Sequence, residues 1–328
     1  MKVLVDYMNV LFMTYHIAKR QLREETGKEE LLKEDMGFFY HIFLNKINYL
    51  IMNYGPLILC HEGKHSTKWR RDIYNGYKAN RDERKEQEEY KVLLETFPIL
   101  EELLNNYPVK QIKVDGMEAD DVIYAIATYE CKTNPDEEIE IISTDKDLIQ
   151  IKNHCSNVEI FNPIRSVHYE SNENIVYEKA ICGDSSDNIP GLHRVGIKTF
   201  EKMLNDKELW NKKMANGNKE IFETFVKIVD LSKFPKEKHE EAIALYKATD
   251  YNKFEPNNIE YFLYENKLED LLMKWGGIQN DIITELINEN RKDLIGNVIA
   301  ENEDTVDHVD LEPEKIETEV DDILNEFI

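Results

Sequence analysis

Short apolar runs alternate with amphipathic stretches over the first half of the chain. The runs at residues 3–5, 57–60, 112–114, 139–143 and 158–161 have the length of buried strands. Residues 38–52 and 91–105, which lie between them, carry apolar side chains at helical spacing. Strands that alternate with helices are typical of βαβ units. We therefore expect an α/β fold with a mostly parallel central sheet and flanking helices.

The strand pattern fades after about residue 170, and the chain then becomes helical in character. We expect an α/β domain over residues 1–170, a helical domain over 171–300 and a tail over 301–328. The tail has a net charge of −11, and one helical face at its end is apolar: Val320, Ile323, Leu324, Phe327 and Ile328. A segment as acidic as this one buries too little apolar surface to offset the conformational entropy that it would lose on becoming ordered. The apolar face suits docking to a partner, and the alternative is that it packs on the C-terminal domain.

The overall charge argues against a nucleic-acid-binding protein. The 328 residues carry a net charge of −24, whereas phosphate binding normally leaves a basic footprint. Residues 64–85 are the exception, with a net charge of +5 that includes Arg70 and Arg71. Trp69, Tyr74 and Tyr77 are interleaved with these bases. This composition is typical of grooves for single-stranded nucleic acid, although a solvated charged helix shares it.

The cysteines and the apolar runs exclude other classes of protein. The four cysteines have no metal-binding spacing, so we expect reduced thiols. The chain begins with a strand-like run in place of a signal peptide, and no apolar run reaches the ~18 residues of a membrane span. We expect a monomer of the cytoplasm.

Acidic residues follow the predicted strands at their carboxyl ends, where open α/β sheets bind ligands. Asp6 ends the first strand, Glu62 and Asp115 follow the next two, and Asp145 and Asp147 follow the fourth. The first turn of a predicted helix and the motif GDSSDN supply the others: Glu118, Asp120, Asp121, Asp184 and Asp187. Taken singly, each acid is ordinary helix or turn chemistry.

Together, these carboxylates indicate a metal site. Two carboxylates ~4 Å apart repel by ~4 kcal/mol at an effective dielectric constant of 20, so several in one crevice need divalent cations. All-oxygen ligands suit Mg²⁺ or Mn²⁺, and two such ions ~3.5–4 Å apart support phosphodiester hydrolysis. The turn IPGLHRVGIKTF has the wrong spacing for a nucleoside-triphosphate loop, but its free N–H groups suit a phosphate.

Five separated segments carry a family resemblance: VDYMN, WRRDIYNGYKANR, EADD, STDKD and GDSSDNIPG. In this order and at these spacings, they resemble the 5′-nuclease (flap endonuclease) family. Within that family, LCHEGKHSTKWRRD and YKANR are most similar to the ribonuclease H branch of T-even bacteriophages. The resemblance spans roughly residues 1–290.

The resemblance implies two Mg²⁺ ions, which Mn²⁺ would replace, beneath a helical arch at about residues 62–95. It also implies a helix-three-turn-helix element that binds the duplex. The matching metal-binding residues are Asp6, Glu62, Glu118, Asp120, Asp121, Asp145, Asp147, Asp184 and Asp187. Glu62 stands where the family usually has Asp, so its oxygen lies further out. The longer turn from Gly191 to Gly196 leaves open the monovalent-cation site that many relatives have there.

The resemblance further implies roles in DNA binding and catalysis. Lys78 and Arg81 match the arch motif, in which they contact the scissile phosphate and stabilise its developing charge. Tyr77 would stack on a base. The residues expected to bind DNA are Arg70, Arg71, Tyr77, Gly191, Gly196 and Lys198.

These observations predict a metal-dependent 5′→3′ exonuclease and flap endonuclease that removes RNA primers during phage DNA replication. Its substrates would be branched or nicked DNA and RNA–DNA hybrid, and the partner of its tail would be the sliding clamp or a single-strand-binding protein. Two other classes stay open: a PIN-domain-like ribonuclease, and a non-catalytic, structure-specific DNA-binding protein of the same fold. The helical segment after residue 170 disfavours the first, and the complete set of aspartates disfavours the second.

Overall fold

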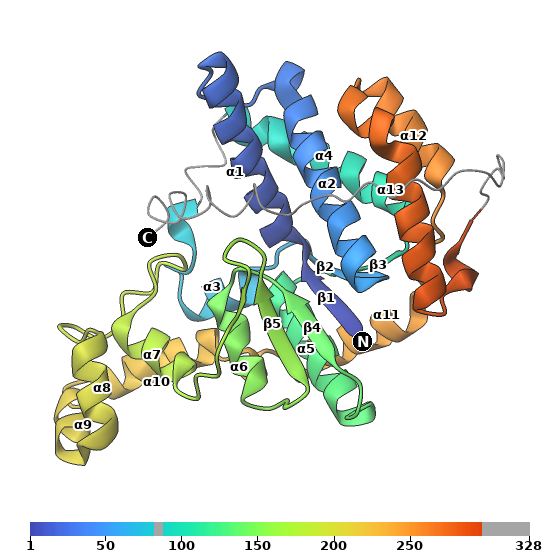
Figure 1. The fold of residues 1–328 in the computed structure, drawn as a ribbon. Helices are drawn as coiled ribbons and strands as arrows, with labels where there is room; N and C mark the ends of the chain where they lie inside the picture. The colour runs from blue at the N-terminus through green and yellow to red at the C-terminus, as the bar shows by residue number, and fades with distance from the viewer. Residues whose placement is uncertain (82–87, 297–328) are drawn as a thin grey trace.

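A six-stranded sheet forms the centre of the protein in the computed structural model, which describes residues 1–81 and 88–296 (Figure 1). Its strands are β1 (Lys2–Asp6), β2 (Leu57–Glu62), β3 (Val109–Val114), β4 (Ile139–Ile142), β5 (Val158–Asn162) and β6 (Val167–His168). The strand order is β3-β2-β1-β4-β5-β6. All neighbours pair in parallel except β5 and β6, which are antiparallel. The predicted mostly parallel sheet is confirmed, and β6 is an edge strand too short for the sequence pattern to indicate.

The central strands β1, β2 and β4 are buried on both faces because helices cover both sides of the sheet. Alternate side chains of a strand point to opposite faces, so Val3 and Val5 belong to one core cluster and Leu4 to the other. The first face packs against α1 (Tyr7–Thr26), α2 (Met36–Tyr54) and α4 (Glu88–Leu103). The second packs against α5 (Ala119–Thr133), α6 (Ile149–Lys152) and α11 (Lys236–Ala248).

The end of the described chain returns to the first face of the sheet. Helices α12 (Pro256–Glu265) and α13 (Glu269–Asn288) lie beside α2 (Figure 1). Trp275 on α13 is 1% exposed in the same core cluster as Phe39 and Phe43 on α2. Within the predicted helical domain, α12 and α13 therefore complete the core on the first face of the sheet.

A smaller helical unit projects from the carboxyl side of the sheet. It comprises α7 (Ile175–Cys182), α8 (Ile197–Asn205), α9 (Lys207–Lys213) and α10 (Asn218–Val229) (Figure 1). Two small apolar clusters hold it together, one around Phe200 and one around Phe225, and the second also includes Tyr77 from outside the unit. We call α7 to α10 the helical unit.

The short helix α3 (Lys68–Ile73) lies near the base of the predicted arch and packs against α10. Residues 82–87 of that arch and the predicted tail at 301–328 lie outside the described residues. Among the helices that the structure describes, none is long and apolar enough to cross a membrane.

Candidate active site

The carboxylates gather where the strand order of the sheet reverses. The chain passes from β1 to β2 on one side and later to β4 on the other, so the ends of β1 and β4 flank the point at which open α/β sheets have their ligand-binding crevice. Asp6 ends β1 and caps α1: it accepts hydrogen bonds from the Asn9 N–H at 3.1 Å and from the Ser143 hydroxyl at 2.9 Å. Asn9 also bonds Thr144 through its amide nitrogen at 2.6 Å and through its oxygen at 3.0 Å. The two strand ends are thus tied together at the crevice.

A first group of carboxylates has more negative charge than its surroundings offset. Burial, with the charges of Asp145 and Glu62 adding to it, raises the pKa of Asp6 to about 7. Burial and the charges of Asp145 and Asp6 hold the pKa of Asp120 well above its usual range. The structure therefore brings Asp6, Glu62, Asp120 and Asp145 close enough for their charges to interact.

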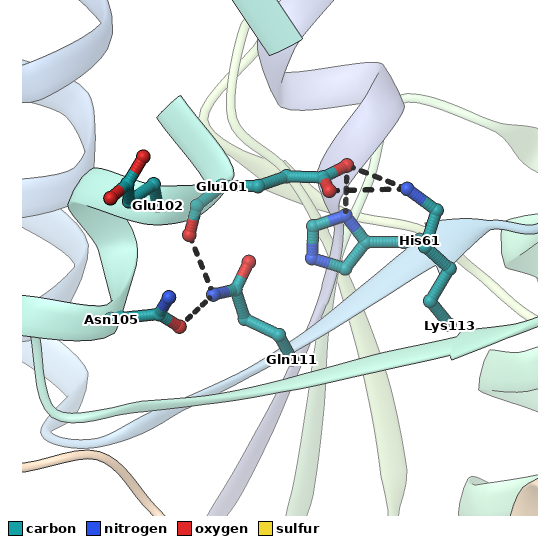
Figure 2. Close-up of a pocket in the computed structure, with 6 residues that line it drawn as sticks. All are labelled: His61, Glu101, Glu102, Asn105, Gln111 and Lys113. Atoms are coloured by element: carbon teal, nitrogen blue, oxygen red, sulfur yellow. Dashed lines mark hydrogen bonds and ion pairs between the residues drawn. The ribbon is translucent and has the colours of Figure 1, made fainter. Parts of the chain in front are cut away.

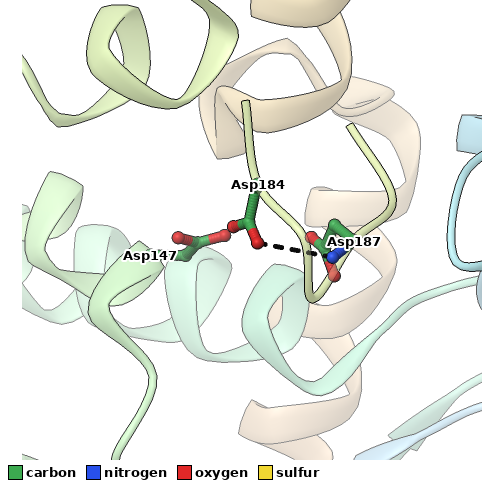
Figure 3. Close-up of side chains that lie close together, drawn as sticks. All are labelled: Asp147, Asp184 and Asp187. Carbon is green, nitrogen blue, oxygen red and sulfur yellow. Dashed lines mark hydrogen bonds between the residues drawn. The ribbon is translucent and has the colours of Figure 1, made fainter. Parts of the chain in front are cut away.

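A second group consists of Asp147, Asp184 and Asp187, whose carboxylate oxygens lie within 4.8 Å of one another. They come from the turn after β4 and from the loop between α7 and α8 (Figure 3). Lys179 of α7 forms ion pairs with Asp147 and, at 2.7 Å, with Asp184. Burial raises the pKa of Asp187, whereas the ion pair with Lys179 and bonds from Ser186 outweigh burial at Asp184 and lower its pKa to about 2.

Both groups fit divalent cations with oxygen ligands. The donors are carboxylates without histidine or cysteine, a set that suits Mg²⁺ or Mn²⁺. Burial first, and neighbouring carboxylates in addition, raise the pKa values of Asp6, Asp120 and Asp187. A cation between them would offset the repulsion between these carboxylates.

Two of the predicted metal ligands are instead held by a buried arginine. The Arg70 guanidinium donates to both carboxylate oxygens of Asp121 at 2.8 and 2.7 Å and to Glu118 at 2.8 Å. Arg70 is 3% exposed and Asp121 0% exposed. Arg70 is therefore not available to DNA, and Asp121 is not available to a metal in this conformation. A buried carboxylate needs a counter-ion, and Arg70 supplies it within the protein.

Tyr77 also lies inside the protein, at 3% exposure. Its hydroxyl donates to Glu118 at 2.9 Å and to Asp187 at 3.3 Å. A ring buried in this way has no free face for a base, so the expected stacking role of Tyr77 is wrong for this conformation. Its position after α3 places it in the apolar cluster of α7 and α10.

The two predicted catalytic cations lie beside the carboxylates. Lys78 forms an ion pair with Glu118 and lies 3.6 Å from Asp187, and Arg81 lies 3.3 Å from Asp187. Although burial opposes it, the charges of Lys78 and Arg70 lower the pKa of Glu118 to about 2. Arg81 is the exposed member of the pair, with 45% of its side chain accessible.

The remaining predicted DNA-binding residues divide into structural and exposed ones. Arg71 donates to the backbone oxygens of Tyr77 and Lys78 at 3.0 and 3.1 Å, so it supports the chain before Arg81. Gly196 and Lys198 are exposed at the start of α8. Gly191 has φ of 67°, and a Cβ there would lie 2.4 Å from the backbone nitrogen of Gly183. The turn thus requires glycine at 191 for its shape.

His61, next to Glu62, faces a separate pocket of about 290 Å³ on the other side of β2 (Figure 2). Alternate residues of a strand point to opposite faces. The His61 ring is 2% exposed, stacks on Tyr7 at a centroid distance of 4.1 Å, and lies 3.5 Å from Glu101. The Glu101 carboxylate also pairs with Lys113 at 2.9 Å. His61 is therefore part of the packing of β2 and not of the carboxylate crevice.

Sequence reasoning missed three residues that organise the site. It identified neither Lys179, between Asp147 and Asp184, nor the role of Arg70 as a counter-ion. It also passed over Gln150, whose amide donates to the Asp147 backbone oxygen at 2.8 Å. Arg70 lies in the segment WRRDIYNGYKANR, which does not show its partner, and none of the segments that carry the resemblance contains Lys179 or Gln150. Only the long-range pairing of elements reveals these roles.

Comparison with known proteins agrees with this geometry. A model of the family described as 5′-3′ exonuclease, N-terminal resolvase-like domain, matches residues 1–181, more than half of the chain. The chain belongs to the 5′-3′ exonuclease family. The predicted family resemblance is confirmed.

Individual relatives of this family differ in how much of them the chain covers. A 5′-3′ exonuclease of Mycoplasmopsis pulmonis is 30% identical over 253 residues, which cover 71% of this chain and 79% of that protein. DNA polymerase I of Bacillus caldotenax is 29% identical over 214 residues, 62% of this chain but 23% of the polymerase. The chain thus spans less than a quarter of that polymerase.

The fold also resembles that of a solved structure. A bacteriophage T5 protein co-crystallised with metal ions aligns with a TM-score of 0.53 and 20% identity, and the alignment covers 80% of this chain and 97% of that one. The expected α/β fold with a helical C-terminal region is confirmed.

Proposed function

We propose that the protein is a divalent-metal-dependent 5′ nuclease that hydrolyses phosphodiester bonds in branched or nicked DNA and in RNA–DNA hybrid. The single observation that carries this proposal is the meeting of two carboxylate groups beside Lys78 and Arg81 at the switch point of the sheet. Membership of the 5′-3′ exonuclease family and the metal ions in the structure of the bacteriophage T5 protein support it.

The residues fit two Mg²⁺ ions, or Mn²⁺ in their place, held by Asp6, Glu62, Asp120 and Asp145 on one side and by Asp147, Asp184 and Asp187 on the other. When bound, the ions supply charge stabilisation for the attacking and leaving oxygens. Lys179 must then leave its ion pair with at least one of its two aspartates.

The protein's own cations would orient the phosphate. Arg81 is exposed next to Asp187 and would bind a non-bridging phosphate oxygen. Lys78 would move from Glu118 to the scissile phosphate and stabilise its developing charge, and Glu118 would retain Arg70 and Tyr77 as partners.

The helical unit would bind the duplex beyond the cut. The exposed Gly196 N–H lies at the start of α8, with Lys198 beside it, and such N–H groups suit a phosphate. Contacts of this kind read the backbone and not the sequence. We place the enzyme in phage DNA replication, in the host cytoplasm, where it would remove RNA primers. Its partner there would be the sliding clamp or a single-strand-binding protein that binds the tail.

The proposal is tested with a 5′-labelled flap and a 5′-labelled RNA–DNA hybrid, each with Mg²⁺ and with chelator. We expect Mg²⁺-dependent products cut at the junction, and no product from Asp145→Asn. Cleavage without preference for the junction would instead indicate a PIN-domain-like ribonuclease. Binding without any product would indicate a non-catalytic DNA-binding protein.

A further inference from the structure

The carboxyl end of α10 is bound by two buried side chains, one from α3 and one from α6. The last carbonyls of a helix have no partner within the helix. At α10, the Arg70 Nε donates to the Ile228 oxygen at 2.9 Å, and the Gln150 amide donates to the Val229 oxygen at 3.3 Å. The Leu231 N–H donates back to the Gln150 oxygen at 2.8 Å. Both side chains are 3% exposed.

Each of these side chains is also linked to one of the two carboxylate groups, through the backbone or through neighbouring residues. Gln150 lies on α6, three residues after Asp147, and donates to the Asp147 backbone oxygen at 2.8 Å. Arg70 binds Glu118 and Asp121, which flank the metal candidate Asp120 at the start of α5. The segment 228–231 is thereby linked to both carboxylate groups. Of their members, only Asp184 and Asp187 lie in the helical unit, on the loop between α7 and α8.

The same segment joins the helical unit to the rest of the protein. Before it, α10 packs against α7, whose following loop carries Asp184 and Asp187. After it, the chain enters α11, which packs against α5. A displacement of α10 must therefore either break the bonds of Gln150 and Arg70 or carry the two carboxylate groups with it.

We propose that segment 228–231 couples duplex binding by the helical unit to the alignment of the carboxylates, with Gln150 and Arg70 as the positioning residues. The proposal rests on the proposed function, because it assumes a nuclease whose helical unit binds the duplex. A simple helix cap at α10 would stabilise the fold without this coupling, so the experiment has to separate the two roles.

The experiment varies the length of the duplex arm of the substrate. Single-turnover cleavage is measured on hairpin-closed arms from about 4 to about 16 base pairs, which extend about 14 to 54 Å at 3.4 Å per base pair. The enzymes are the wild type, Gln150→Met, and the control Gln111→Met. Gln111 also donates two side-chain hydrogen bonds, at 2.9 and 2.8 Å, but on β3 away from the helical unit.

For the wild type and Gln111→Met, we expect the rate to rise with arm length. Gln150→Met should lose at least about tenfold more rate on the longest arm than on the shortest, because the bound duplex no longer positions Asp147. Should Gln150→Met not fold, Gln150→Glu replaces it, since its carboxylate still accepts from Leu231 but cannot donate to Asp147 or Val229.

Equal losses on every arm would mean that Gln150 supports only the local fold, and unchanged rates would mean that it positions nothing. Either outcome overturns the coupling. If the wild type itself cuts no arm, the nuclease proposal fails, and this result is distinct from both.

Discussion

Replacing Arg70 by methionine should be among the most damaging single changes outside the apolar core. The guanidinium makes two bonds to Asp121, one to Glu118 and one to the Ile228 backbone oxygen, all between 2.7 and 2.9 Å. Methionine fills much of the space but leaves Asp121, which is 0% exposed, without a counter-ion. Removal of one partner from a buried ion pair costs ~3–5 kcal/mol. The orphaned Ile228 carbonyl adds ~1–3 kcal/mol.

The loss should therefore reach at least ~4 kcal/mol, a large part of the ~5–15 kcal/mol that stabilises a typical protein. Urea unfolding followed by circular dichroism measures it. Lys68→Met is the matched control on the same helix, because its 2.6 Å pair with Asp72 is exposed and such pairs contribute ~0.2–0.5 kcal/mol.

A second substitution tests the cause of the loss. The double variant Arg70→Met with Asp121→Asn removes the uncompensated charge, so it should recover part of the stability that Arg70→Met loses. If the double variant is less stable than Arg70→Met, or if Arg70→Met costs no more than Lys68→Met, the assignment of Arg70 as a buried counter-ion is refuted.

The other predictions concern the metal-binding carboxylates, the contact of Lys78 with the scissile phosphate, and the turn at Gly191. Because the pKa of Asp6 is raised to about 7, the metal-free protein loses stability from this group as the pH rises from about 4 towards 7. A cation competes with that proton, so Mg²⁺ should raise the melting temperature more at about pH 8 than at about pH 6; equal increments would contradict this. Asp145→Asn should abolish cleavage while DNA binding by fluorescence anisotropy is kept or tightened, and wild-type turnover in saturating Mg²⁺ would refute the metal assignment. Lys78→Ala should lower the single-turnover rate by ~10²–10³ with a much smaller change in affinity, whereas the reverse pattern would make Lys78 a docking residue. Gly191→Ala should weaken duplex binding and stability, because its Cβ would lie 2.4 Å from the Gly183 nitrogen at φ of 67°; unchanged anisotropy titrations and melting curves would show that the turn adapts.

The sequence predicts those features that depend on local pattern. Apolar runs mark β1, β2, β4 and β5 nearly to their ends, and an acid after a strand in a parallel sheet must lie at one edge, so Asp6 and Asp145 were predictable as neighbours. The pattern also predicts most of α2, but it does not show that α12 and α13 cover that helix, since an amphipathic face does not name its partner.

The sequence does not show which charged side chains pair with one another. Arg70 and Arg71 occur in a basic stretch with Lys78 and Arg81, and any of them could bind either DNA or a carboxylate of the same chain. Arg70 pairs with Asp121 of α5 because α3 packs against α10 next to α5, whereas Arg81 stays exposed. The buried position of Tyr77 has the same origin.

The return of α12 and α13 to the first face of the sheet has a consequence for synthesis on the ribosome. Helix α2 is complete at Tyr54, but the helix that covers it, α13, ends only at Asn288. At ~5–20 residues per second, the apolar face of α2 waits roughly 10–50 s for its cover. During that time, Phe39 and Phe43 lie in a core cluster that lacks Trp275 and its neighbours. The nascent chain therefore exposes the apolar face of α2 for most of its translation, and its need for chaperones should fall sharply once α13 has left the exit tunnel.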